Sequence, residues 1–191
     1  GIQMADKINQ WLRLQEHPLN VHIGSDGDPF ASHIYRHFML EAQQKENITY
    51  SILTNGLLFN EFHTKAMGVI KNLKVLGISI DGATKNTYEK LRLGGNWEKI
   101  KSNLKTISEV KKKFNFCVKL YMVVQQDNWN EMLDMADLGK TYGADEIYFN
   151  KIQDWNTRVD HSKQNFTQLE EFKALRDQVS NMDGCFVKGG L

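Results

Sequence analysis

Hydrophobic positions along this chain alternate between two spacings. Short apolar runs rich in β-branched residues, typical of buried strands, are separated by stretches in which apolar residues recur every three or four positions, as on one face of a helix. The short runs predict strands at residues 19–23, 48–53, 75–80, 116–124 and 146–150. The helical spacing predicts helices at residues 5–16, 30–44, 59–70, 85–91, 97–113, 129–142 and 167–179.

Strands that are separated by helices pair in parallel through right-handed crossovers, so this order predicts an α/β fold of parallel β-strands alternating with helices. Periodicity alone leaves open whether the strands form an open doubly wound sheet or part of a barrel. In both architectures, functional side chains gather where the carboxyl ends of the strands meet. Gly143 is expected to end the helix at 129–142.

The strand at residues 75–80 runs directly into a polar turn and a helix. Ser79 and Asp81 lie two positions apart, so their side chains point to the same side of a strand. Gly82 allows a sharp turn, and Thr84 is a natural N-cap for the next helix. Two oxygen-bearing side chains therefore meet at the edge where α/β folds bind ligands. A strand end with a capping aspartate is the simpler interpretation and stays open.

Polar residues follow the other predicted strands as well. They are Asp26, Gly27 and Asp28, then Thr54 and Asn55, then Gln125 and Gln126, and finally Asn150 and Lys151. Because loops are generally polar, most of these residues are weak evidence for a binding site. The glycine-containing loop at residues 24–29 indicates a ligand site more specifically, because its glycines allow the backbone to approach a ligand closely and its carboxylates suit an ammonium group. Asp-Gly and Asp-Pro are also ordinary turn dipeptides. The glycine spacing is neither that of a dinucleotide fingerprint nor that of a P-loop.

Composition narrows the class of protein. The 191 residues are 41% hydrophobic and carry a net charge of +1 without a basic stripe, which favours one globular domain and no nucleic-acid partner. No apolar run is long enough to span a membrane and no signal peptide is visible, so we expect no membrane association and a cytoplasmic location. With only Cys117 and Cys185, a disulfide framework is not expected.

No metal site is expected from the histidines and cysteines. His33 and His37 have the i, i+4 spacing of a helical ligand pair, but no third ligand lies near them in sequence. Cys185 is either a free cysteine in a tail or the first thiolate of an auxiliary-cluster domain.

Several segments, in order, resemble the core of the radical S-adenosylmethionine (SAM) enzymes, which is a partial (β/α)6 TIM barrel. Residues 24–29 resemble the family's Gly-Gly-Glu-Pro loop, residues 52–56 its Thr-Asn-Gly strand end, and residues 78–92 its Ser-x-Asp-Gly segment with a Tyr-Glu-x-x-Arg helix; residues 123–128 and 143–147 fit its fifth and sixth strands. The resemblance covers roughly residues 19–155. It is closest to members that carry an auxiliary-cluster extension and act on peptides or other sizeable substrates.

The resemblance implies a role for the loop after the first predicted strand. Asp28, with the backbone around Asp26 and Gly27, would face the amino group of SAM. The loop departs from the family pattern, because Asp26 stands where a glycine is usual and Asp28 where a glutamate is usual. The side chain of Asp28 therefore reaches one methylene less far.

Roles for five other residues follow from the same resemblance. Ser79 would hydrogen-bond the methionine or ribose part of SAM, and Asp81 would orient the same region. Thr54 and Asn55 would line the cavity near the substrate. Lys119 would reach the SAM carboxylate if its side chain faces inward.

The sequence lacks the cysteine motif on which the family builds its 4Fe-4S cluster. That motif, Cys-x-x-x-Cys-x-x-Cys, follows the family's first strand, and two distant cysteines cannot replace three thiolates from one loop. We therefore expect residues 1–182 to be an incomplete radical SAM core, comprising strands two to six of the family barrel. Residues 183–191 would be a tail or the start of a truncated extension. This chain is expected to bind neither SAM nor a cluster tightly.

Two functions remain after these comparisons of motifs. In the first, the complete enzyme uses its cluster to generate a 5′-deoxyadenosyl radical from SAM and modifies a small-molecule or peptide substrate that the sequence does not identify. In the second, the chain is a cluster-less, non-catalytic α/β binding or assembly domain of the same ancestry. The altered loop favours the second function, whereas truncation explains the missing cysteines equally well.

Overall fold

The computed structural model describes residues 1–24, 27–42, 44–152 and 165–188. Its strands are β1 (Leu19–Ile23), β2 (Ile48–Thr54), β3 (Leu73–Ser79), β4 (Cys117–Val124), β5 (Glu146–Lys151) and β6 (Cys185–Lys188). Its α-helices are α1 (Ile2–Arg13), α2 (His33–Glu41), α3 (Phe59–Phe62), α4 (Met67–Ile70), α5 (Lys85–Leu91), α6 (Trp97–Phe114), α7 (Met132–Tyr142) and α8 (Glu170–Ser180). The described residues also form three short 3₁₀ helices, η1 (His63–Ala66), η2 (Trp129–Glu131) and η3 (Asn165–Gln168).

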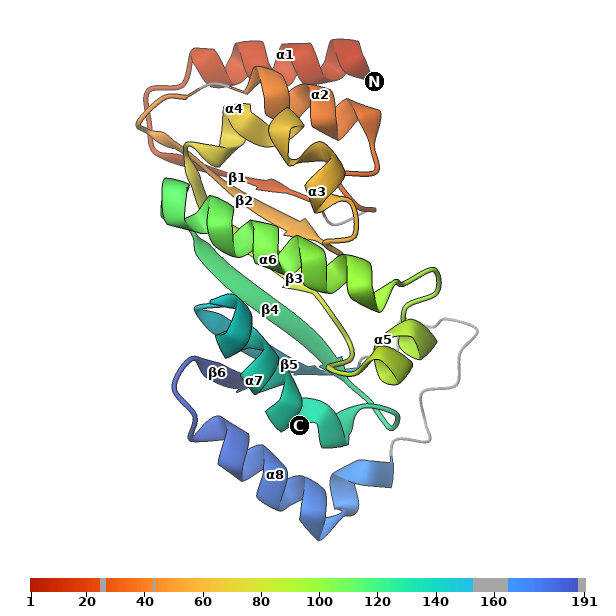
Figure 1. Ribbon diagram of the computed structural model, residues 1–191. Coiled ribbons are helices and arrows are strands. Elements are labelled where there is room, and N and C mark those ends of the chain that lie inside the picture. Colours follow the sequence, from red (N-terminus) through yellow and green to blue (C-terminus); the bar gives the residue numbers. More distant parts are fainter. Residues whose placement is uncertain (25–26, 43, 153–164, 189–191) are drawn as a thin grey trace. The chain divides into compact units, whose positions relative to one another are not determined.

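The strands of the described residues form one sheet in the order β1-β2-β3-β4-β5-β6. The pairs β1–β2, β2–β3, β4–β5 and β5–β6 are parallel. Helices separate consecutive strands along the chain (Figure 1). The predicted α/β class, with parallel strands that alternate with helices, is thereby confirmed.

Strand β6 was not predicted from the sequence. From the sequence, residues 183–191 are expected to be a tail or the start of an extension. Residues Cys185–Lys188 pair with β5, with Cys185 opposite Ile147 and Phe186 opposite Tyr148. A four-residue strand is too short to show a period of its own, so its place in the sheet depends on the partner strand.

The chain divides into two compact units. Unit 1 comprises Gly1–Ile78 and Lys99–Val118, and unit 2 comprises Ser79–Glu98 and Lys119–Leu191.

In unit 1, α1, α2 and α4 lie over the same face of β1 and β2 (Figure 1). Leu12 of α1, Met39 of α2 and Ile48 of β2 are almost fully buried there. The helix predicted at residues 59–70 is divided into α3, η1 and α4. At the division, both the backbone N–H and a ring nitrogen of His63 contact the carbonyl of Phe59, so that carbonyl is shared between two partners.

In unit 2, α7 packs against β5, and α8 packs against α7 and β6. The buried positions of β4 alternate with half-buried ones, so that Leu120, Met122 and Val124 share one face of the strand. Gly143 ends α7 with a φ of 72°, the left-handed conformation expected of a glycine at this position.

Candidate functional site

In unit 1, the carboxylate of Asp28 joins the loop after β1 to the end of β2. One oxygen accepts hydrogen bonds from the Thr54 hydroxyl (2.6 Å) and the Asn55 backbone N–H (2.7 Å). The other oxygen accepts from the backbone N–H of Phe30 (2.9 Å). The structure thus brings together Asp28, Thr54 and Asn55, three of the residues that the sequence singled out.

The turn after β2 is fixed by further hydrogen bonds. The Thr54 hydroxyl accepts from the Gly56 N–H (3.0 Å), and the Asn55 side chain accepts from the Leu57 N–H (2.9 Å). Asn103 of α6, which is fully buried, donates its side-chain amide to the Gly56 carbonyl (2.6 Å). The Thr-Asn-Gly turn is therefore held in one conformation by its own side chains and by α6.

In unit 2, the side chains of Ser79 and Asp81 meet at the guanidinium of Arg92. An Arg92 terminal nitrogen lies 2.8 Å from a carboxylate oxygen of Asp81, with the two side chains 26% and 14% exposed. The same nitrogen donates to the Ser79 hydroxyl oxygen. The second carboxylate oxygen of Asp81 accepts from the Val123 N–H (2.9 Å). We call these three residues the Ser79–Asp81–Arg92 group.

The turn between β3 and α5 is held by two residues that precede α7. Asn128 donates its side-chain amide to the carbonyls of Asp81 and Val123, both at 2.9 Å. The Glu131 carboxylate accepts from the backbone N–H groups of Ala83 (2.7 Å) and Thr84 (3.2 Å). Thr84 also caps α5, as predicted, by accepting from the Thr87 N–H (3.4 Å).

Lys119 of β4 is engaged by neighbouring side chains of β5. Its ammonium lies 2.6 Å from the Glu146 carboxylate and donates to the Tyr148 hydroxyl at 3.5 Å. The hydrogen bond with Glu146 raises the pKa of Lys119, and the hydrogen bond with Lys119 lowers the pKa of Glu146. A ligand carboxylate would therefore compete with Glu146 for this ammonium.

The predicted site residues form separate local groups in the structure. Asp28, Thr54 and Asn55 form one group within unit 1, and Ser79 and Asp81 form another within unit 2. Asp26 lies outside the described residues. Gly27 has a φ of 97° and open space where a side chain would project, which suits close approach of a ligand to its backbone. Convergence of the two groups on one cavity stays a prediction.

Three residues that organise the site were not assigned roles from the sequence: Arg92, Asn128 and Glu131. The sequence offered one signal for Arg92, since it ends the Tyr-Glu-x-x-Arg segment. Asn128 and Glu131 have the spacing of a capping box, in which the glutamate serves its own helix. Glu131 instead reaches the start of α5, and only the tertiary structure shows this.

An iron–sulfur cluster does not fit the described residues. They contain no group of three or more His, Cys, Asp or Glu side chains arranged to hold a metal ion. Cys185 is buried in β6, where burial raises the pKa of its thiol and disfavours the thiolate that a cluster requires. His37 lies 2.7 Å from Asp6, which gives this histidine a partner other than His33.

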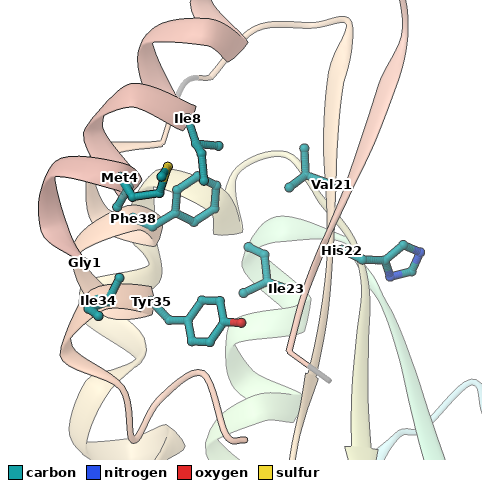
Figure 2. A pocket seen from close by; sticks show the side chains of 10 residues that line it. Gly1, Met4, Ile8, Val21, His22, Ile23, Ile34, Tyr35 and Phe38 are labelled. Atoms are coloured by element: carbon teal, nitrogen blue, oxygen red, sulfur yellow. The ribbon is translucent and has the colours of Figure 1, made fainter. Parts of the chain in front are cut away.

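Unit 1 also contains an apolar pocket of about 200 Å³ between α1, α2 and β1. Figure 2 shows Met4, Ile8 and Phe38 directed toward Val21 and Ile23, whereas the His22 side chain points away. The predicted site residues do not line this pocket. In the part of the chain that the structure describes, there is no helix long and apolar enough to cross a membrane.

Comparison with known proteins identifies the family of this chain. The fold defines an α/β protein with a parallel sheet, a class in which ligands generally bind at the carboxyl ends of the strands. A family model described as the radical SAM superfamily matches residues 4–139. The chain therefore belongs to the radical SAM superfamily. No curated protein sequence matches it.

Solved structures with the same fold include two of SuiB from Streptococcus suis. The structure bound to the precursor peptide SuiA is 14% identical with a TM-score of 0.69, and the structure bound to S-adenosylmethionine is 13% identical with a TM-score of 0.65. Each comparison covers 97% of this chain and 42% of the SuiB chain. An HMG-CoA lyase from Bacillus subtilis is 12% identical with a TM-score of 0.57, covering 97% of this chain and 61% of that one. These similarities show the fold, and the family model adds the superfamily.

Proposed function

We propose that this chain is the SAM-binding part of a longer radical SAM enzyme and that SAM binds at the carboxyl ends of its strands. The observation that carries the proposal is the Ser79–Asp81–Arg92 group, which presents a hydroxyl, a carboxylate and a guanidinium at the end of β3. Membership of the superfamily supports SAM as the ligand. Because the chain spans less than half the length of SuiB, the rest of the enzyme would lie outside it.

Each member of the group has a distinct task in this proposal. Asp81 holds the Arg92 guanidinium in place, and the guanidinium in turn binds an anionic part of the ligand, such as the methionine carboxylate. The Ser79 oxygen accepts from Arg92, which leaves the hydroxyl proton of Ser79 to donate to an oxygen of the ligand.

The Asp28 group contributes mainly through backbone positions. The carboxylate of Asp28 already accepts three hydrogen bonds, so its first effect is to shape the loop that contains Gly27. The loop then offers backbone atoms to the SAM amino group. Thr54 and Asn55, held by the same carboxylate, line the cavity near the substrate.

In this proposal the described residues bind SAM, whereas the cluster is held by cysteines elsewhere in the longer protein, because the described residues contain no group of three metal-binding side chains. When bound together, the two cofactors supply the radical chemistry that the superfamily is named for. The residues of this chain bind SAM, orient it and exclude water. We extend the proposal to a peptide substrate, because the structure of SuiB with its precursor peptide shares the fold.

The test uses the longer protein after anaerobic reconstitution of its cluster. Arg92→Gln and Ser79→Ala should each weaken SAM binding, measured by isothermal titration, whereas Glu171→Gln on the exposed side of α8 should not. Unchanged affinity in both site variants would show that the assignment is wrong. If the sequence before Gly1 contains no three-cysteine motif, the non-catalytic alternative becomes the better explanation.

A further inference from the structure

We infer that Glu131 is a positioning residue, which fixes α5 and thereby places Arg92 against Ser79 and Asp81. This inference rests on the proposed function only for the identity of the ligand. The contacts that carry it lie within unit 2.

The Glu131 side chain has the contacts of a structural anchor. It is only 7% exposed, and its carboxylate accepts four hydrogen bonds at the start of α5. Two come from backbone N–H groups, and two come from the hydroxyls of Thr84 (2.7 Å) and Thr87 (2.5 Å). Since a buried carboxylate is costly unless its oxygens are satisfied, this arrangement strongly favours one position of the turn.

The turn that Glu131 holds is also packed tightly against α5. A side chain at Gly82 would meet the backbone of Thr87 and Tyr88, so only glycine allows this approach. Asn128 fixes the other side of the turn by donating to the Asp81 carbonyl. The segment from Asp81 to Thr84 is therefore held between α5 and the residues before α7.

Helix α5 transmits this anchor to Arg92. The helix has seven residues, begins at Lys85, directly after the cap that Glu131 holds, and ends at Leu91, directly before Arg92. The Nε of Arg92 is buried without a hydrogen-bond partner, and a terminal nitrogen of its guanidinium contacts Asp81 and Ser79. The placement of the guanidinium thus depends on the orientation of a short helix whose first turn is fixed by Glu131.

A local test compares variants of the 191-residue chain without any ligand. In wild type the buried Arg92 Nε–H should give a sharp, slowly exchanging NMR resonance. Glu131→Gln should broaden or shift it strongly, because an amide cannot accept from all four donors. Thr87→Val should have a smaller effect and Thr87→Ser almost none, since serine keeps the hydroxyl. Glu171→Gln, exposed on α8, is the matched control. An Arg92 resonance that is unchanged in a folded Glu131→Gln variant would overturn the inference.

A second test measures SAM affinity of the longer, reconstituted protein in a double-mutant cycle. Glu131→Gln should weaken binding by about tenfold in the wild-type background and have little effect in the Arg92→Gln background, because its effect passes through Arg92. Equal losses in both backgrounds would contradict positioning through Arg92. If wild type fails to bind SAM, the proposed function is wrong, and the NMR comparison still decides the role of Glu131.

Discussion

The Asp28 carboxylate illustrates how one side chain can define a loop at the site. It accepts one hydrogen bond from nearby Phe30 and two from Thr54 and Asn55, which lie 26 and 27 residues away in sequence. The family resemblance pointed to Asp28 as a ligand-binding residue. The structure shows that its carboxylate also satisfies donors of the protein.

We expect Asp28→Asn to destabilise the chain. The amide nitrogen would face donors instead of accepting from them, leaving at least one partly buried donor unsatisfied, at a cost of about 1–3 kcal/mol. Urea unfolding of the variant measures this directly. Asp137→Asn, at an exposed position of α7, should stay within about 0.5 kcal/mol of wild type. Equal stabilities of the two variants would contradict the role assigned to Asp28.

The Lys119–Glu146 pair should make stability depend on pH. Because Lys119 lowers the pKa of Glu146 in the folded state, the pair stabilises the fold above the pKa of the unfolded carboxyl, about 4.3, and this contribution is lost as pH falls through the lower folded value. Because the pKa of Lys119 is raised in the folded state, the stabilisation from this pair persists into alkaline pH and is lost only as pH rises through the folded pKa of Lys119. The difference in unfolding free energy between wild type and Lys119→Met should therefore be constant near neutral pH and shrink below about pH 4.

Chemical unfolding at a series of pH values measures this difference. Lys105→Met, at an exposed position of α6, should show no such dependence. A Lys119→Met difference that stays constant down to about pH 3 would contradict the assignment, because the Glu146 carboxyl of the unfolded chain, with a pKa of about 4.3, is largely protonated there.

Part of the site was predictable from single residues. Alternation along a strand placed Ser79 and Asp81 on one side, and Thr84 was recognisable as a cap. Their connection through Arg92 was not predictable, because it depends on the length and direction of α5. The reach of Glu131 to another helix likewise depends on tertiary packing, which local spacing does not encode.

At the scale of elements, the sequence predicted the strands whose apolar runs are long. It missed β6, which has four residues, and it merged α3, η1 and α4 into one helix. Helical spacing persists through residues 59–70 although the hydrogen bonding changes within them. Hydrophobic periodicity reports which side is buried, and it does not report where a helix tightens or bends.

Two glycines in helices allow a matched test of close packing. A side chain at Gly68 in α4 would meet the backbone carbonyl oxygens of Met39 and Leu40, which belong to α2. At Gly139 in α7 it would meet the end of the Ile147 side chain, which can rotate. Gly68→Ala should therefore cost about 1–3 kcal/mol, and Gly139→Ala clearly less, since alanine also favours a helix by up to about 1 kcal/mol.

Thermal or urea unfolding of both glycine variants gives the comparison. If Gly139→Ala is the more destabilising variant, the close approach of α4 to α2 is not as the structure describes it.

At the scale of the whole molecule, the order of elements and the motif order indicated one superfamily, and the family model confirms it. The fold alone would not suffice, because an HMG-CoA lyase shares it. The described residues contain no group of three or more side chains that could hold a metal cluster. Anaerobic reconstitution of the 191-residue chain should therefore yield no four-iron cluster and no SAM cleavage. A stoichiometric cluster with its visible absorbance would contradict this expectation.

The most direct test of the central claim is an NMR titration of the 191-residue chain with SAM at concentrations up to about 10 mM, where even weak binding is detectable. We expect saturable amide shifts at Gly27, Asn55 and Gly56 and at Asp81 to Thr84, which Arg92→Gln should reduce. Absence of shifts at both sets of residues, or shifts only elsewhere in the chain, would contradict a SAM site built on the Ser79–Asp81–Arg92 group.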